Sequence, residues 1–226
     1  MNLLNQKYSK EVSDIIKSSA QYPSLTKAED GTMYVCYQEY KDGHDCIVAG
    51  VLNQEKDTFS EVERISGEGE ALKPVCVSSG NQIWYAWGEC RNQVWGIYYR
   101  SYENGVYGEI HCAEEGEALF YPCLYAKDGI VYLLWNRQSS NAGEIVLSTI
   151  DEEGIHDVQM VSTSKETYRP SICITEDHTI YVAYDSFNGT TYDVIVRACK
   201  DQVLDRGKSS KYFKNSIGAT QPLLGI

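Results

Sequence analysis

Short apolar stretches alternate with polar turns along the whole of this chain, and the unit at residues 122–161 shows the pattern most clearly. Its turns are Lys127-Asp128-Gly129 and Asp151 to Gly154, and a polar loop is expected at 136–143. The β-rich stretches between them predict strands at 122–126, 130–135, 144–150 and 155–161. The pattern therefore predicts a four-stranded antiparallel meander, and no stretch has the periodicity of a long helix.

This unit repeats along the chain, and its proline marks the period. The five prolines are separated by 51, 48, 48 and 52 residues: Pro23, Pro74, Pro122, Pro170 and Pro222. After each of the first four, the second apolar stretch closes on an aromatic residue: Tyr37, Trp87, Trp135 and Tyr184. Four strand-like segments in a period of about 40 to 50 residues are typical of β-propeller blades. The sequence therefore predicts an all-β protein, a β-propeller of four-stranded antiparallel blades, with the repeated aromatics packing between blades.

The repeat assigns residues 1–226 to one domain with four complete blades, at about 22–66, 73–112, 121–162 and 169–215. Residues 11–18 resemble the fourth strand of a blade, and residues 219–226 resemble a first strand. These orphan strands have two interpretations. Either they meet in one incomplete fifth blade, or the chain is a fragment of a longer propeller with five or six blades. The second is favoured because the last four residues stop in the middle of a strand.

Charge and composition exclude several classes of partner. The formal net charge of −12 repels phosphate backbones and anionic lipid, so no nucleic acid and no membrane partner is expected. No stretch approaches the roughly 18 apolar residues of a membrane span. Residues 1–20 lack the apolar core of a signal peptide, so the chain as written is expected in the cytoplasm, and outside the cell if its true N-terminus is missing. No phosphate-binding, dinucleotide or zinc motif occurs, and no cofactor is expected.

The eight cysteines follow the repeat. Cys76, Cys123 and Cys173 fall in the first strand of successive units and are predicted to be small core residues. No pair has the C-x-x-C spacing of a metal or redox site. Disulfides become an alternative if the protein is secreted.

The residues before the prolines are the first candidates for ligand binding, because they enter the innermost strand beside the central channel. All five are polar or hydrogen-bonding: Tyr22, Lys73, Tyr121, Arg169 and Gln221. One interpretation is a solvated rim, in which each is held extended by the proline that follows it. The other is a ring of donors and aromatic faces around an axial pocket that suits a polyhydroxylated or anionic ligand.

The loops after the second strands contribute charged residues to the same face. Glu39, Glu89 and Asp185 are the candidate catalytic residues, because glycoside hydrolysis commonly uses two carboxyl groups roughly 5 to 9.5 Å apart. Arg91 and Arg137 are further candidates for ligand binding. The alternative for each of these charges is a solvated rim of the blade loops. No three histidines are placed to form a metal site.

Two units, PCLYAKDGIVYLLWNRQSSNAGEIVLSTIDEEG and PVCVSSGNQIWYAWGECRNQVWGIYYRSYENGVYGEI, resemble the blades of sialidase-like (BNR-repeat) propellers. The Asp-box of that family, Ser-x-Asp-x-Gly-x-Thr-Trp, does not occur. Tyr168-Arg169-Pro170 is similar to the family's Arg-Ile-Pro motif but lacks the intervening residue. The resemblance implies a propeller of the carbohydrate-active kind, with six blades when complete.

Two functions follow as hypotheses. The first is a glycan-recognising propeller that belongs to a glycoside hydrolase or polysaccharide-degrading enzyme and takes a carbohydrate or other small polar ligand on its channel face. The alternative is a non-catalytic scaffold that binds a protein or peptide partner on the same face. Propellers host many unrelated functions, so the fold leaves open whether the chain is an enzyme.

Overall fold

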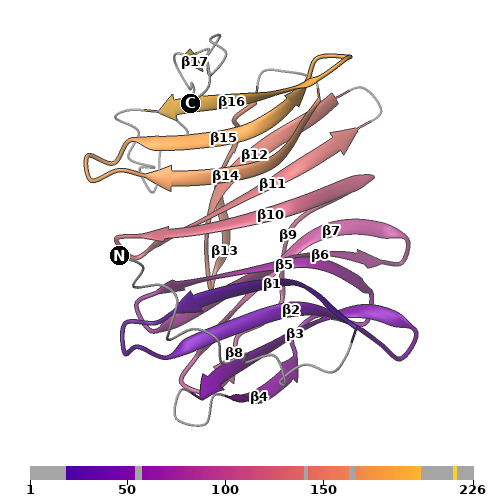
Figure 1. Ribbon diagram of the computed structural model, residues 1–226, viewed down its shortest axis with the longest axis vertical. Coiled ribbons are helices and arrows are strands. Elements are labelled where there is room, and N and C mark those ends of the chain that lie inside the picture. Colours follow the sequence, from indigo (N-terminus) through magenta and orange to yellow (C-terminus); the bar gives the residue numbers. More distant parts are fainter. Residues whose placement is uncertain (1–18, 54–57, 140–141, 163–165, 200–215, 218–226) are drawn as a thin grey trace, which may run out of the picture.

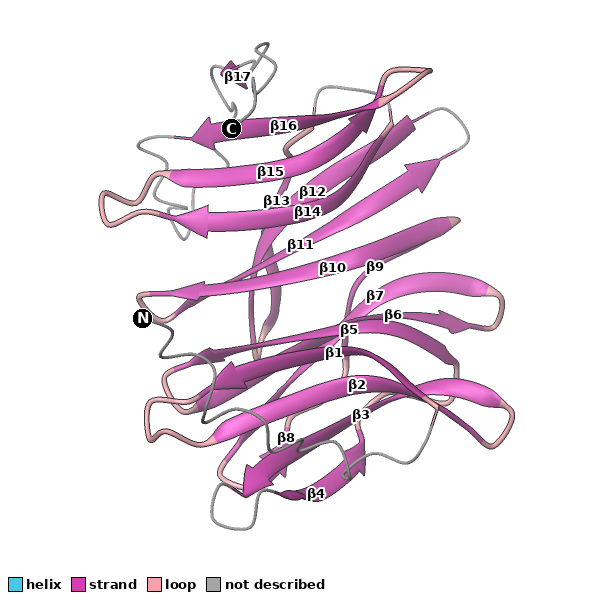
Figure 2. Cartoon of the chain, viewed as in Figure 1, coloured by secondary structure: helices cyan, strands magenta, loops and turns pink. Residues whose placement is uncertain are grey.

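The computed structural model describes residues 19–53, 58–139, 142–162, 166–199 and 216–217. In these ranges the chain forms strands and their connections, and no helix (Figure 2). It follows that no helix capable of crossing a membrane occurs in the described ranges. The strands form four antiparallel sheets, which confirms the predicted fold class.

Each sheet is one blade built from neighbouring strands of the sequence. Blade 1 contains β1 (Ala20–Lys27), β2 (Met33–Lys41), β3 (His44–Asn53) and β4 (Thr58–Arg64). Blade 2 contains β5 (Glu70–Ser79), β6 (Gln82–Arg91), β7 (Val94–Glu103), β8 (Val106–Tyr107) and β9 (His111–Gly116). Blade 3 contains β10 (Ala118–Lys127), β11 (Ile130–Ser139), β12 (Ala142–Asp151) and β13 (Gly154–Met160). Blade 4 contains β14 (Thr167–Ile174), β15 (Ile180–Phe187), β16 (Tyr192–Cys199) and β17 (Ser216–Ile217).

The blades stack in chain order, with blade 1 at one end and blade 4 at the other (Figure 1). Their first strands, β1, β5, β10 and β14, contact one another in succession along the stack. These are the strands that line the channel of a propeller. The expected orphan strands at 11–18 and 219–226, and most of 200–215, lie outside the described residues.

A β-bulge interrupts the first strand of every blade at its proline. The register with the second strand shifts between Gln21 and Ser24, and it shifts at the same point in the other three blades. Proline lacks an N–H for the ladder and is tolerated where a bulge leaves residues unpaired. The strands therefore begin three or four residues before their prolines, earlier than the apolar pattern predicts.

The expectation that the residues before the prolines are extended is wrong. Tyr22, Lys73, Tyr121 and Arg169 have φ values of 52°, 52°, 54° and 51°, in the left-handed region. A non-glycine residue in this region is strained, at a cost of about 1 kcal/mol or more. The proline disfavours the right-handed helical conformation of the residue before it. In the bulge this residue adopts the left-handed conformation in place of the extended one.

The core lies between the blades. Trp87 packs with Cys36 and Ile47 of the preceding blade, and Trp135 and Tyr184 contribute to the two following interfaces. These three aromatic side chains are at most 2% exposed, which confirms their predicted packing role. Each such burial contributes about 2–3 kcal/mol to stability. Tyr37, their counterpart in blade 1, is buried on the face turned away from blade 2, beside Val35 and Val48.

The cysteines follow the prediction in part. Cys76 is buried and Cys123 is half-buried. Cys173 is exposed, contrary to the prediction, because it lies on the face of blade 4 that no further blade covers in the described part of the chain. Free thiols are found at Cys36, Cys46, Cys76, Cys90, Cys112, Cys123 and Cys173.

Two strand boundaries also differ from the expected pattern. The polar stretch at 136–143 is largely strand, because β11 continues to Ser139 and β12 begins at Ala142. The fourth strand of blade 2 is divided into β8 and β9, which pair with different parts of β7. The tight turns are as predicted: Asn104-Gly105 and Asp128-Gly129 both have positive φ.

Candidate ligand-binding face

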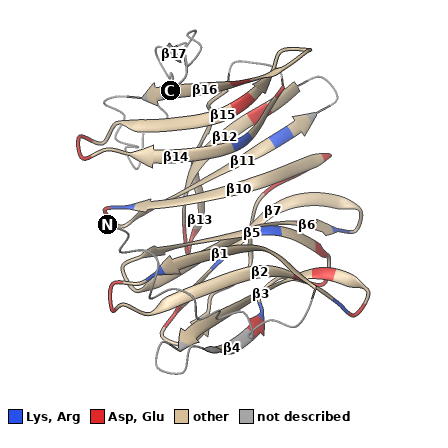
Figure 3. Cartoon of the chain, in the orientation of Figure 1, with Lys and Arg blue, Asp and Glu red and all other residues tan. Residues whose placement is uncertain are grey.

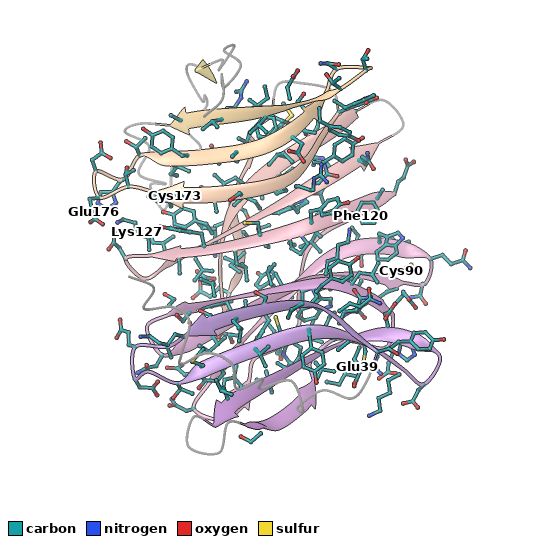
Figure 4. All side chains as sticks on the ribbon, viewed as in Figure 1. Glu39, Cys90, Phe120, Lys127, Cys173 and Glu176 are labelled. Atoms are coloured by element: carbon teal, nitrogen blue, oxygen red, sulfur yellow. The ribbon has the colours of Figure 1, made fainter. Side chains whose placement is uncertain are left out.

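The hairpins that join the second and third strands project from one side of the stack, which we call the loop face. Glu39, Cys90 and Phe120 lie toward this side, and Lys127 and Glu176 lie at the opposite side (Figure 4). Antiparallel pairing places these hairpins and the entries to the first strands on the same side. The loop face therefore includes the strained residues before the prolines.

Lys73 lies between two tyrosines of neighbouring blades. Its Nζ is 3.9 Å from the ring centroid of Tyr121 and 5.8 Å from that of Tyr22, whose side chain is 50% exposed. Among the described residues no carboxylate forms an ion pair with this ammonium. The buried Gln38 of blade 1 accepts a hydrogen bond from the Lys73 backbone N–H, at 3.1 Å, and so fixes the bulge. Three residues before prolines thus form one contiguous row.

Arg169 extends the row into blade 4. Its Nε donates to Asp185 Oδ2, and its guanidinium lies 5.7 Å from the ring of Tyr192. The bond to Asp185 raises the pKa of Arg169 above its ordinary value. Tyr192 also contacts Tyr168 and Phe187, with ring centroids 6.1 and 5.0 Å away. The side chain of Arg169 is 59% exposed and that of Asp185 is 22% exposed, so both remain accessible to a ligand.

Arg137 is held by carboxylates on both sides. Its Nη1 lies 2.8 Å from Glu114 Oε1 of β9, and its Nη2 lies 2.7 Å from Glu144 Oε2 of β12. The bond to Glu114 is the main cause that raises the pKa of Arg137. Glu114 also accepts a hydrogen bond from Trp135 Nε1 at 2.6 Å. Figure 3 marks the charged residues of β11, β12, β14 and β15 on this side of the stack.

Glu89 is enclosed in the protein and has no exposed surface. Its carboxylate accepts hydrogen bonds from Trp87 Nε1 at 2.8 Å and from the guanidinium of Arg91 at 3.0 and 3.1 Å. The backbone N–H groups of Gly67 and Gly69 donate at 3.2 and 3.1 Å. Burial raises the pKa of Glu89, but the bonds from Arg91 and Trp87 outweigh burial and hold the pKa below its ordinary value. These hydrogen bonds fix the position of the Glu89 carboxylate and stabilise its ionised form.

The remaining candidates are dispersed. Glu39 is half-buried and lines a hollow of about 130 Å³ with Lys41 and Arg64. It belongs to blade 1, and Asp185 belongs to blade 4, so the two carboxylates lie at opposite ends of the stack. Gln221 lies outside the described residues. The structure therefore brings Tyr22, Lys73 and Tyr121 together and leaves the three candidate catalytic carboxylates in separate places.

Sequence reasoning missed the groups that orient the candidates. Glu114 and Glu144 hold Arg137, and Gln38 holds the backbone of Lys73. These bonds join residues that are 7 to 35 positions apart. The repeat gave one signal for Gln38, because it directly follows the repeated aromatic, as Asn136 does in blade 3.

No protein-family model matches this chain. No curated protein matches it either. Solved structures do match. A protein of unknown function from Dyadobacter fermentans is 14% identical with a TM-score of 0.60, over 80% of this chain and 66% of that one. A neuraminidase-like protein of subtype N10 from the virus A/little yellow-shouldered bat/Guatemala/060/2010 is 9% identical with a TM-score of 0.54, over 80% of this chain and 60% of that one.

A third match is an α-L-arabinofuranosidase from Lactobacillus brevis, 10% identical with a TM-score of 0.52, over 86% of this chain and 73% of that one. The chain spans less than two thirds of the length of the first structures that it matches. Identities this low show a shared fold and no more. The chain is therefore a β-propeller whose blades are arranged like those of structures that include neuraminidase-like and glycoside hydrolase proteins.

Proposed function

We propose that the loop face recognises a glycan that carries a negative charge as well as hydroxyl groups. One observation carries the proposal: four successive blades use a strained bulge to present Tyr22, Lys73, Tyr121 and Arg169 at equivalent positions. Strained backbone of this kind is concentrated at functional sites, and bulges re-aim side chains there. A rim of solvated polar residues would not require a strained backbone at the same position of every blade.

The chemistry of the row suits such a ligand. The faces of Tyr22 and Tyr121 offer apolar platforms for sugar rings, and the Lys73 ammonium between them is ready for a carboxylate. Arg169 supplies a second cation, already oriented by Asp185. Arg91 and Arg137 are engaged by carboxylates and would act as the walls of the site.

We propose that the loop face binds the glycan, and the proposal does not include its hydrolysis. A glycosidase pair needs two carboxyl groups roughly 5 to 9.5 Å apart. Glu89 is enclosed, and Glu39 and Asp185 lie at opposite ends of the stack. The similar structures include a xylan β-1,4-xylosidase and two α-L-arabinofuranosidases, which supports a carbohydrate as the ligand class for this chain.

Calorimetric titration with an oligogalacturonate and with a neutral arabino-oligosaccharide tests the proposal. We expect the anionic glycan to bind more tightly, and Lys73→Ala and Tyr121→Ala each to weaken it about tenfold, which corresponds to about 1.4 kcal/mol. Lys127→Ala is the matched control, because it removes the same charge from the opposite face. Equal weakening by Lys127→Ala would show that only the overall charge matters.

Two results would overturn the proposal. Tight binding that Lys73→Ala and Tyr121→Ala leave unchanged would place the glycan site elsewhere. An absence of binding to either glycan would return the row to the alternative of a peptide or protein scaffold.

A further inference from the structure

A pocket of about 300 Å³ lies between blades 1 and 2. Its lining residues belong to β2, β3 and β4 of blade 1 and to β6, β7 and β8 of blade 2, and Figure 1 shows β8 beside β3 and β4. Tyr34 lies near the start of β2, and Gly105 lies in the turn between β7 and β8. Because successive antiparallel strands reverse direction, these positions are opposite the hairpins that join the second and third strands. The pocket is therefore on the side away from the loop face.

Four tyrosine rings form the wall of this pocket. The ring centroids of Tyr34 and Tyr102 are 5.7 Å apart, and the two planes meet at 60°. Tyr107 follows at 4.6 Å from Tyr102, at 53°, and Tyr85 at 6.2 Å from Tyr107, at 49°. Stacked rings would cover one another's faces, whereas rings inclined in succession turn their faces toward a common space. The four side chains thus have the arrangement of an aromatic cage.

The packing of the blades holds these rings in place. Tyr85 is 1% exposed and belongs to the buried cluster between blades 1 and 2. Tyr34, Tyr102 and Tyr107 are half-buried and pack against the same cluster. The cage is therefore formed before any ligand arrives, and three of its rings keep part of their surface exposed.

The mouth of the pocket is open and carries a negative charge. Glu63 of β4 is exposed, and it is the one charged side chain among the residues that line the pocket. At Gly105, a Cβ would meet no heavy atom within 4 Å. Gly50, another lining residue, also lacks a side chain. A ligand can therefore reach the rings and place a positive charge beside Glu63.

Arg100 shows that a ring of this cage already attracts a cation. Its guanidinium carbon lies 4.8 Å from the ring centroid of Tyr107. The guanidinium does not line the pocket, because it donates to the backbone carbonyl of Gly108 at 3.1 and 2.6 Å and to that of Ile65 at 3.3 Å. No cation of the described residues forms an ion pair with Glu63. The carboxylate at the mouth is thus left for a ligand.

This chemistry suits a quaternary ammonium group better than a primary one. A primary ammonium group has three N–H donors, and each needs an acceptor once water is removed. The pocket supplies one carboxylate and four ring faces. A trimethylammonium group has no N–H to satisfy, and its methyl groups pack against aromatic faces while its charge interacts with the rings.

We infer that this pocket binds a trimethylammonium group, with Tyr34, Tyr85, Tyr102 and Tyr107 as its cage and Glu63 as its counter-charge. The group can belong to a small molecule such as choline or to a trimethylated lysine of a peptide. The site is independent of the glycan proposal, because no residue of the row on the loop face lines it.

Calorimetric titration of the full chain with choline tests the inference. The control ligand is 3,3-dimethylbutan-1-ol, which has the shape of choline but a carbon atom in place of the charged nitrogen. We expect saturable binding of one choline per chain, about tenfold tighter than binding of the neutral analogue, because the rings attract the charge. A short peptide with trimethyllysine carries the same group, and the tighter of the two ligands identifies the source of the group.

Two pairs of variants separate the cage from general effects. Tyr102→Leu removes a ring face and should weaken choline binding about tenfold, while Tyr102→Phe keeps the ring and should stay within about twofold of the wild type. Glu63→Gln should weaken binding about threefold. Glu153→Gln removes an exposed carboxylate from the turn between β12 and β13 of blade 3, and should leave the affinity unchanged. Thermal melting of each variant identifies any that has lost its fold.

Four results would overturn the inference. The first is an absence of saturable binding of both choline and the trimethyllysine peptide. The second is equal affinity for choline and its neutral analogue, which would mean that the rings do not recognise the charge. The third is wild-type affinity in a folded Tyr102→Leu, or, if that variant does not fold, a tenfold loss of affinity in Tyr102→Phe. The fourth is equal weakening by Glu153→Gln and Glu63→Gln, which would show that only the overall charge matters.

Discussion

Glu89 shows how one side chain can hold several parts of a blade. Its carboxylate joins the indole of Trp87, the guanidinium of Arg91 and the backbone of Gly67 and Gly69, which precede β5. Gly69 also lies so close to the backbone of Cys90 that a Cβ there would come within 2.2 Å of the Cys90 carbonyl oxygen. The segment that enters blade 2 is therefore fixed by the buried Glu89 carboxylate and by Gly69, where no side chain would fit.

Glu89→Gln tests this role. We expect a loss of about 3 kcal/mol in the free energy of unfolding at neutral pH, because the donors around a buried charge lose their partner. The folded pKa of Glu89 is lowered, so its contribution is complete above its ordinary pKa near 4.5 and is lost as the pH falls through the folded value. Urea unfolding at pH 7 and at successively lower pH should show the gap between wild type and variant closing.

The control is Glu68→Gln, since the Glu68 side chain is 97% exposed. It should change stability by less than about 0.5 kcal/mol. A gap between wild type and Glu89→Gln that widens in acid would contradict the assigned pKa direction.

At the level of the strand, the proline bulge is the repeated feature. It leaves two residues of the first strand opposite one of the second, and the residue before the proline has a left-handed backbone. Glycine adopts positive φ readily, whereas a β-branched residue there is a steric outlier. The bulge therefore restricts the size and branching of the side chain at this position more than its charge.

Substitutions at Lys73 separate the effect of side-chain size and branching from the effect of charge. We expect Lys73→Gly to retain or raise stability, by up to about 1 kcal/mol, and Lys73→Val to lose about 1–2 kcal/mol, because valine is strained at a φ of 52°. Thermal melting of both variants measures the difference. If Lys73→Val were as stable as Lys73→Gly, the backbone at this residue would not be left-handed in solution.

At the scale of the molecule, stability resides in the interfaces between blades. Each interface buries side chains from two sheets, and blade 3 contributes Leu134 and Leu147 to its contact with blade 4. The outer face of blade 4 is different, because Tyr181, Val194 and Val196 are exposed on it. A repeat protein of this kind gains its stability from neighbouring repeats.

Leu134→Ala should therefore lower the free energy of unfolding by about 3 kcal/mol, through the lost burial and the cavity that it leaves. Leu134 has no exposed surface. Val194→Ala is the control, because Val194 is 65% exposed and should lose little. Urea unfolding followed by tryptophan fluorescence measures both. Equal stability of the two variants would mean that blades 3 and 4 do not pack as described.

The repeat was readable because proline and aromatic residues recur at a fixed spacing, and that spacing predicted the blades, the turns and the packing of Trp87 and Trp135. The left-handed backbone conformation of Lys73 could not be predicted, because a residue before proline usually prefers an extended conformation. The burial of Glu89 was not readable either, since nothing in a local sequence separates an exposed carboxylate from one enclosed by distant glycines.

The proline bulge also separates what the molecule recognises from what keeps it folded. The path of each first strand is set by the proline and the left-handed backbone before it, while Tyr22, Lys73, Tyr121 and Arg169 contribute no residue to the buried clusters between blades. Four equivalent positions can thus exchange side chains without repacking the interior. Substitutions at these four positions can therefore change the ligand preference of the loop face while every blade interface stays as it is.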